Sequence, residues 1–148
     1  QPDDAVAAYD RAIADFEEAV RRDPSTEATS QHYAAMALAG KAAVELERDA
    51  LERATDLLIA SFERWPSAAN ALDGLNASAV TTSNLVMARL KWAGLDDAAA
   101  RLQAAKDALD PELLEMPAFE RVPNTPAARN RDRRGRQVPP QEKRDGQR

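Results

Sequence analysis

The chain has 148 residues, so its length fits one domain, and a compact chain of this size buries roughly two thirds of its unfolded surface. Aromatic residues are only 5% of the sequence while alanine is abundant, which favours helices packed closely over small side chains and disfavours a β-sandwich. The absence of cysteine excludes disulfides, thiolate metal sites and a thiol nucleophile. No apolar run approaches the roughly 20 residues that span a bilayer, so we expect a soluble protein.

Charge is distributed unevenly along the chain. From Arg121 to the end there are nine Lys or Arg against three Asp or Glu, a net of +6, which leaves −11 for the first 120 residues of a chain whose total is −5. The sequence therefore predicts an acidic body with a basic tail. The chain begins at Gln1 rather than methionine, so processing or truncation has removed its start. A cytoplasmic location and an exported or organellar one both stay open.

The stretch DRAIADFEEAVRRDP, residues 10–24, carries the clearest helical pattern. Small and apolar residues recur at the spacing of one helical stripe, and charged residues occupy the opposite face. The stripe consists of Ala12, Ile13, Phe16, Ala19 and Val20. We predict a helix over residues 3–22, capped by Asp3 or Asp4. It ends at Asp23 because the next residue, Pro24, cannot continue it.

A second helix is expected to open at Ser25 or Thr26. The apolar pattern breaks at ELERD, residues 45–49, which we interpret as a turn, although the alternative is one long helix over residues 26–64. The third helix, residues 49–64, should end where Trp65 meets Pro66. Its predicted inward face comprises Leu51, Ala54, Leu57, Leu58, Ser61, Phe62 and Trp65.

Residues 67–80 are rich in Ala, Asn and Ser, and fit either a loop or the opening of a long fourth helix. The pattern predicts a helix more securely over residues 81–92, with Gly94 as its C-terminal cap. A fifth helix should begin at Asp96 or Asp97 and reach Leu109, followed by one more turn over residues 112–115.

Beyond residue 116 the composition changes. Residues 117–148 hold five of the nine prolines and few large apolar side chains, so they cannot bury enough surface to offset the entropy of ordering. We therefore divide the chain into an all-α domain over residues 1–116 and a Pro/Arg-rich extended or disordered tail over residues 117–148.

The helix ends that carry proline share a pattern. Counting back 12, 8 and 5 residues from Pro24 and from Pro66 gives a small, a large and a small residue in both cases, and Pro111 repeats the first position with Ala99. YDRAIADFEEAVRRDP resembles the second helix of a tetratricopeptide repeat and its turn. The prolines lie 42 and 45 residues apart, against about 34 in that family, so helices or connections must be longer.

The resemblance implies antiparallel helical hairpins stacked as a short array that binds other protein subunits. Partners would lie in a groove lined by the first helix of each pair, near residues 31–39 and 84–91. The basic tail would anchor to a neighbouring subunit. The predicted partner-binding residues are Gln31, Tyr33, Asn84, Arg89, Arg129, Arg131, Arg133, Arg134, Arg136, Lys143 and Arg144. Self-association stays open.

Catalysis has little support in the sequence. The single histidine, His32, has no clustered metal or acid–base partners nearby in sequence, so we expect it to be structural or on the surface. No nucleophile elbow, phosphate loop or zinc-protease motif is present. We predict a non-enzyme without cofactor or metal, whose tryptophans, Trp65 and Trp92, pack in the core or at helix ends, with partner contact by one as the alternative.

The tail also permits a second function. Its arginines suit phosphate or carboxylate, so an accessory protein associated with nucleic acid is the alternative to protein anchoring. Interleaved acidic residues and the absence of aromatic residues make base stacking less favourable.

Overall fold

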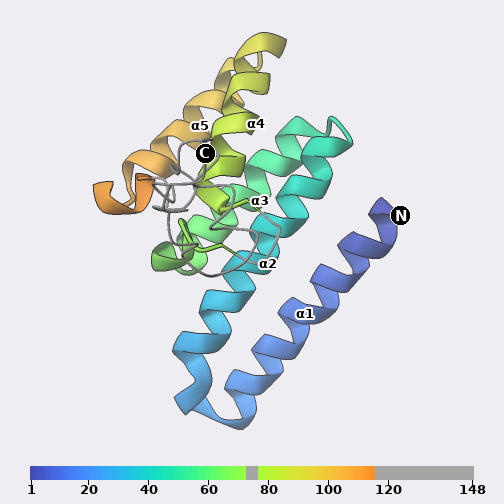
Figure 1. Ribbon diagram of the computed structural model, residues 1–148, viewed down its shortest axis with the longest axis vertical. Helices are drawn as coiled ribbons and strands as arrows, with labels where there is room; N and C mark the ends of the chain where they lie inside the picture. The colour runs from blue at the N-terminus through green and yellow to red at the C-terminus, as the bar shows by residue number, and fades with distance from the viewer. Residues whose placement is uncertain (73–76, 116–148) are drawn as a thin grey trace, which may run out of the picture. The chain divides into compact units, whose positions relative to one another are not determined.

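The computed structural model describes residues 1–72 and 77–115, which are helical with no strand, so the all-α prediction is confirmed (Figure 1). The predicted tail, residues 117–148, lies outside the described residues, and its boundary with the helical domain stays a prediction. The elements are α1 (Pro2–Arg22), η1 (Pro24–Thr26), α2 (Glu27–Glu47), α3 (Leu51–Arg64), η2 (Pro66–Ala68), α4 (Ala79–Ala93), α5 (Asp96–Asp107) and η3 (Pro111–Leu114), where η marks a 3-10 helix.

Helix α1 has the predicted limits within one residue. Its N-cap is Gln1, so the expected capping by Asp3 or Asp4 is wrong, although both carboxylates lie in the first turn where the helix dipole favours them. At the other end Asp23 leaves the helix and its carboxylate accepts hydrogen bonds from the Ser25 hydroxyl and backbone N–H. These bonds lower the pKa of Asp23.

The turn between α2 and α3 confirms two helices in place of one long one. Asp49 has a left-handed φ of 61°, a conformation that Asp tolerates better than most residues, and this reverses the chain without Gly or Pro. The Ala50 N–H then donates to the Glu45 carbonyl at 2.9 Å. Glu45 is 1% exposed, and its side chain pairs with Arg48 at 3.3 Å and Arg53 at 3.7 Å. Glu45 therefore belongs to the turn's buried support, although its charge interrupts the apolar stripe.

The segment before α4 is a loop wherever it is described, so the alternative of a long fourth helix is wrong. Ser78 is extended and its hydroxyl accepts from the Thr81 N–H at 3.2 Å, which starts α4 at Ala79. Gly94 closes α4 with a left-handed φ of 71°, as predicted. Helix α5 begins at Asp96 but ends two residues before Leu109.

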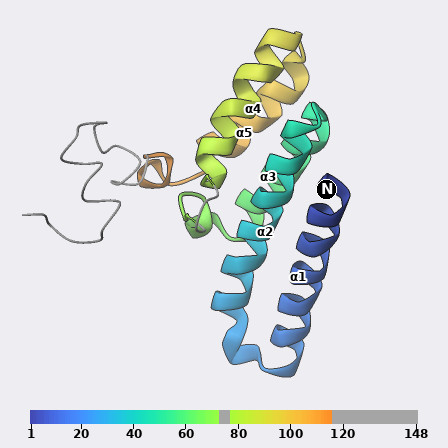
Figure 2. The same ribbon diagram turned by 45° about the vertical axis from the view of Figure 1, so that its right-hand side comes forward.

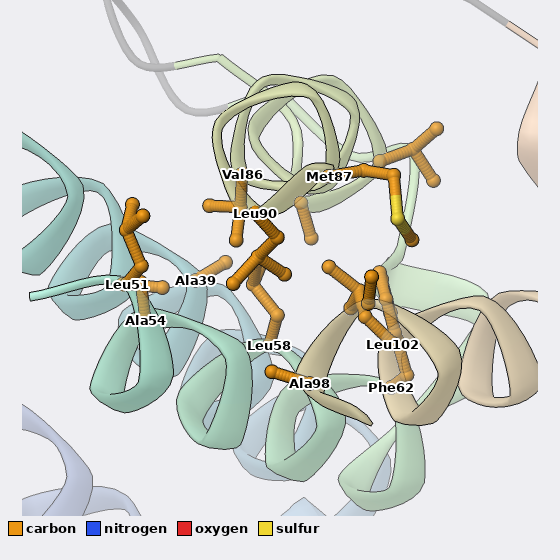
Figure 3. Packing of buried hydrophobic residues seen from close by; sticks show 14 of the residues in the cluster. Ala39, Leu51, Ala54, Leu58, Phe62, Val86, Met87, Leu90, Ala98 and Leu102 are labelled. Carbon is orange, nitrogen blue, oxygen red and sulfur yellow. The ribbon is translucent and has the colours of Figure 1, made fainter. Parts of the chain in front are cut away.

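The core is built by α2 to α5. Figure 3 shows Val86 and Leu90 of α4 directed toward Leu58 of α3, with Leu102 of α5 beside them. Every one of the predicted inward residues of α3 is buried except Leu57 and Trp65, which are half-buried. Helix α1 contributes no fully buried residue and lies along α2 at the edge of the helical domain (Figures 1 and 2).

Candidate binding groove

An apolar groove of about 190 Å³ lies between α1 and α2 and is also lined by Ala68, Ala71, Ala77 and Ala79. Three lining residues of α1 and three of α2 include all those that are not alanine, and the other lining residues are alanines. These six are Tyr9, Ala12 and Phe16 from α1, and Tyr33, Met36 and Gly40 from α2. An apolar cavity of about 150 Å³ is enough to hold benzene, so this groove has room for one aromatic or branched side chain.

The absence of a side chain at Gly40 shapes one part of the groove. A Cβ atom built there would lie 2.5 Å from the ring of Tyr9. The tyrosine ring therefore occupies the space over the glycine, and α1 approaches α2 closely at this point. Gly40 is thus required by the Tyr9 ring, a neighbour that only the fold supplies.

Aromatic rings line the end of the groove near η1. The rings of Phe16 and Tyr33 are stacked with centroids 5.8 Å apart, and His32 meets Tyr33 edge-on at 5.3 Å. Tyr33 is 48% exposed, so it is available to a partner. His32 is half-buried against this ring. Within residues 1–72 and 77–115 no cluster of His, Asp and Glu is arranged to hold a metal ion.

Ion pairs join α1 to α2 and to α3. Lys41 pairs with Asp10 at 2.7 Å, Arg64 pairs with Glu17 at 3.1 Å, and the Arg48 guanidinium contacts Asp3. Since all three acidic partners are substantially exposed, each pair stabilises α1 by only about 0.5 kcal/mol. Helix α1 is therefore held by weak polar contacts and by a partly covered apolar stripe.

The predicted partner-binding residues of α2 differ in their surroundings. Tyr33 lines the groove, as described above. The side-chain oxygen of Gln31 instead accepts a hydrogen bond from Nε of Arg64 at 2.7 Å, and the same guanidinium reaches Glu17. Arg64 of α3 thus links Gln31 of α2 to Glu17 of α1.

The predicted residues of α4 lie outside the groove lining. Asn84 accepts a hydrogen bond from the Lys106 ammonium of α5, and Arg89 pairs with Asp49 at 2.6 Å. Burial lowers the pKa of Lys106, the charge of Asp107 opposes this, and the nearby charge of Lys91 adds to the lowering. The structure therefore does not bring Asn84 and Arg89 to the same site as Tyr33. The seven predicted residues of the tail, Arg129 to Arg144, lie outside the described residues.

The exposure of Trp92 contradicts the prediction that both tryptophans pack in the core or at helix ends. The Trp92 side chain is 92% exposed, so it packs neither in the core nor over the end of α4, whereas Trp65 is half-buried. Leu85, two helical turns earlier, is 55% exposed. The apolar residues of α4 occupy more than one face of the helix, and Val86 and Leu90 are on the buried face.

Three comparisons with known proteins concern the chain as a whole. No protein-family model matches the sequence, and neither a curated protein nor a solved structure is similar to it. No helix in the described part of the chain is both long enough and apolar enough to cross a membrane.

Proposed function

We propose that this protein is a non-catalytic interaction module, an assembly subunit that holds an apolar side chain of a partner protein in the groove between α1 and α2. The observation that carries the proposal is the groove itself. It combines an apolar lining, an exposed aromatic residue at Tyr33 and a wall, α1, in which no residue is fully buried. Interfaces commonly use such pockets to hold one large apolar anchor from the partner.

The helical arrangement supports a tetratricopeptide-like role. Each of the three prolines on which the repeat was aligned, Pro24, Pro66 and Pro111, begins a 3-10 helix after a longer helix. In α3 the small, large and small positions are all buried, and in α5 Ala99 is buried. Within α1 the equivalent positions are half-buried. A further helix against α1 would complete their burial, and we assign that place to a partner.

The tail contributes a second contact in this proposal. Its net charge of +6 is opposite to that of the first 120 residues, and arginine forms paired hydrogen bonds with carboxylates on a neighbouring subunit. The arginines and lysine named above, from Arg129 to Arg144, would supply these contacts.

Site-specific photo-crosslinking in the source cells tests the groove. A photoreactive amino acid at Met36, in the groove, should crosslink to one defined protein, and the same group at Glu63, on the exposed side of α3, should not. Ala12→Lys, which places a charge in the groove, should abolish the crosslink from position 36, and Ala14→Lys on the exposed side of α1 should leave it intact. Equal crosslinking from both positions, or none from position 36, would contradict the proposal.

A separate measurement tests the tail. Co-purification of the captured partner should decrease when residues 118–148 are removed, and unchanged recovery would exclude an anchoring role. The nucleic-acid alternative would instead be favoured if nucleic acid co-purifies and its recovery falls steeply as the salt concentration rises, while recovery of the partner protein does not.

A further inference from the structure

The outer face of α4 is an apolar stripe that no described element covers. Leu85, Ala88 and Trp92 are spaced i, i+3 and i+7, so they lie on one side of the helix, and all three are exposed. Figure 3 shows Val86, Met87 and Leu90 on the side that packs in the core. The two large residues of the stripe are separated by about 10 Å along the helix axis.

The charges on α4 itself are all positive. Residues 79–93 contain Arg89 and Lys91 but no Asp or Glu. Lys106 of α5 lies near Lys91, whose charge adds to the lowering of the Lys106 pKa that burial mainly causes, while Arg89 is paired with Asp49. Two such stripes placed face to face would bring like charges together, which disfavours a symmetric contact between two α4 helices.

The groove has the complementary properties. Its wall, α1, has six acidic and three basic residues, a net of −3. Asp15 lies one helical turn beyond Ala12, is exposed, and has no ion pair within the described residues. The groove also has room for one aromatic ring, as shown above. An apolar stripe with cations and an apolar groove with the unpaired Asp15 carboxylate on its wall, α1, therefore occur on the same chain.

We propose that the occupant of the groove is the Leu85–Trp92 face of a second copy of this chain, with the Trp92 indole inserted beside Tyr33 and Met36. The inference rests on the groove being the binding site of the proposed function. Because the two surfaces are different patches, the contact is head-to-tail, and each dimer keeps one free groove and one free stripe. Association therefore continues into longer oligomers as the concentration rises.

Mixing of two variants tests this arrangement with the full chain in analytical ultracentrifugation. Trp92→Ala removes the stripe's anchor and keeps the groove, while Ala12→Lys blocks the groove and keeps the stripe. Each alone should stay monomeric, with self-association weakened about thirtyfold, the loss expected for a tryptophan at the centre of an interface. The equimolar mixture should form a one-to-one dimer that grows no further, because the remaining surfaces are both disabled.

The controls separate the contact from the fold. Trp92→Phe and Ala14→Lys should associate like the unmodified chain, and all variants should keep the same helical circular dichroism. In a Trp65→Phe background, Trp92 emission should shift to shorter wavelength on association, since the indole leaves water.

Three outcomes would overturn the inference. They are an unmodified chain that stays monomeric, an Ala12→Lys variant that still dimerises through a symmetric stripe, and a mixture that forms no dimer. The proposed function would survive these outcomes if position 36 still crosslinks to a different protein in the Trp92→Ala background. It would fail with the inference if no crosslink forms at all.

Discussion

Helices α1 and α3 have similar local sequences but different places in the molecule. Both are amphipathic, both present a small, a large and a small residue at matched distances before a proline, and both end where that proline begins a 3-10 helix. In α3 those positions, Ala54, Leu58 and Ser61, are 0–3% exposed, because α2, α4 and α5 all pack against this helix. The equivalent residues of α1 are half-buried, since α2 alone among the long helices packs extensively on it. The same sequence pattern therefore contributes differently to stability, depending on the helices that pack against it. The partly covered helix, α1, is the one that can accept a partner.

The largest expected effect is the loss of a core side chain from α3. Leu58→Ala should lower the free energy of unfolding by about 3 kcal/mol, because Leu58 is fully buried and its removal leaves a cavity between α3, α4 and α5. Urea denaturation followed by circular dichroism measures this change. A loss smaller than that caused by Phe16→Ala in α1 would contradict the conclusion that α3 is better covered by its neighbours than α1.

The equivalent change in α1 should be smaller. Phe16→Ala should cost about 1.5 kcal/mol, since the Phe16 ring is half-buried and stacked only on Tyr33. The same denaturation experiment applies. The loss in free energy of unfolding caused by Phe16→Ala is expected to be larger when a partner occupies the groove, because the ring is then buried on both sides.

Because of the contact between Gly40 and Tyr9, Gly40→Ala should change the free energy of unfolding in opposite directions with and without the Tyr9 side chain. In the unmodified chain Gly40→Ala should destabilise by about 1 kcal/mol, because the new methyl group must displace the Tyr9 ring and this outweighs the gain in helix propensity. In a Tyr9→Ala background the same substitution should stabilise by about 1 kcal/mol. A double-mutant cycle measures both values, and the same sign in both backgrounds would show that α1 does not approach α2 as described.

The smallest effect concerns the ion pairs along α1. Removal of the Lys41–Asp10 pair by Lys41→Met should cost about 0.5 kcal/mol at low ionic strength, because Asp10 is half-exposed and water screens the attraction. The loss should nearly vanish at 1 M salt, where the screening length is about 3 Å. A loss independent of salt would indicate that packing of the Lys41 stem, rather than its charge, holds α1.

Local chemistry made much of the fold predictable. Proline after Asp23 and Trp65, glycine at position 94, and the interruption of the apolar stripe at residues 45–49 set the helix ends. The choice between one and two helices over residues 26–64 depended on Asp49 adopting a left-handed conformation, which no Gly or Pro signalled. Of the predicted binding residues, Tyr33 lines the groove between α1 and α2, whereas Asn84 and Gln31 bond to neighbouring helices that the sequence did not identify.

The sequence by itself determined that this chain forms helices, where most of them begin and end, and which residues are apolar on each. Only the tertiary structure decided which residues became the core: the apolar side chains of Leu85 and Trp92 face water, and Glu45 is buried while Tyr33 is exposed. The physical reason is that helix formation and termination depend on residues within one or two turns, whereas burial depends on segments that are distant in sequence and come together only when the chain reverses direction.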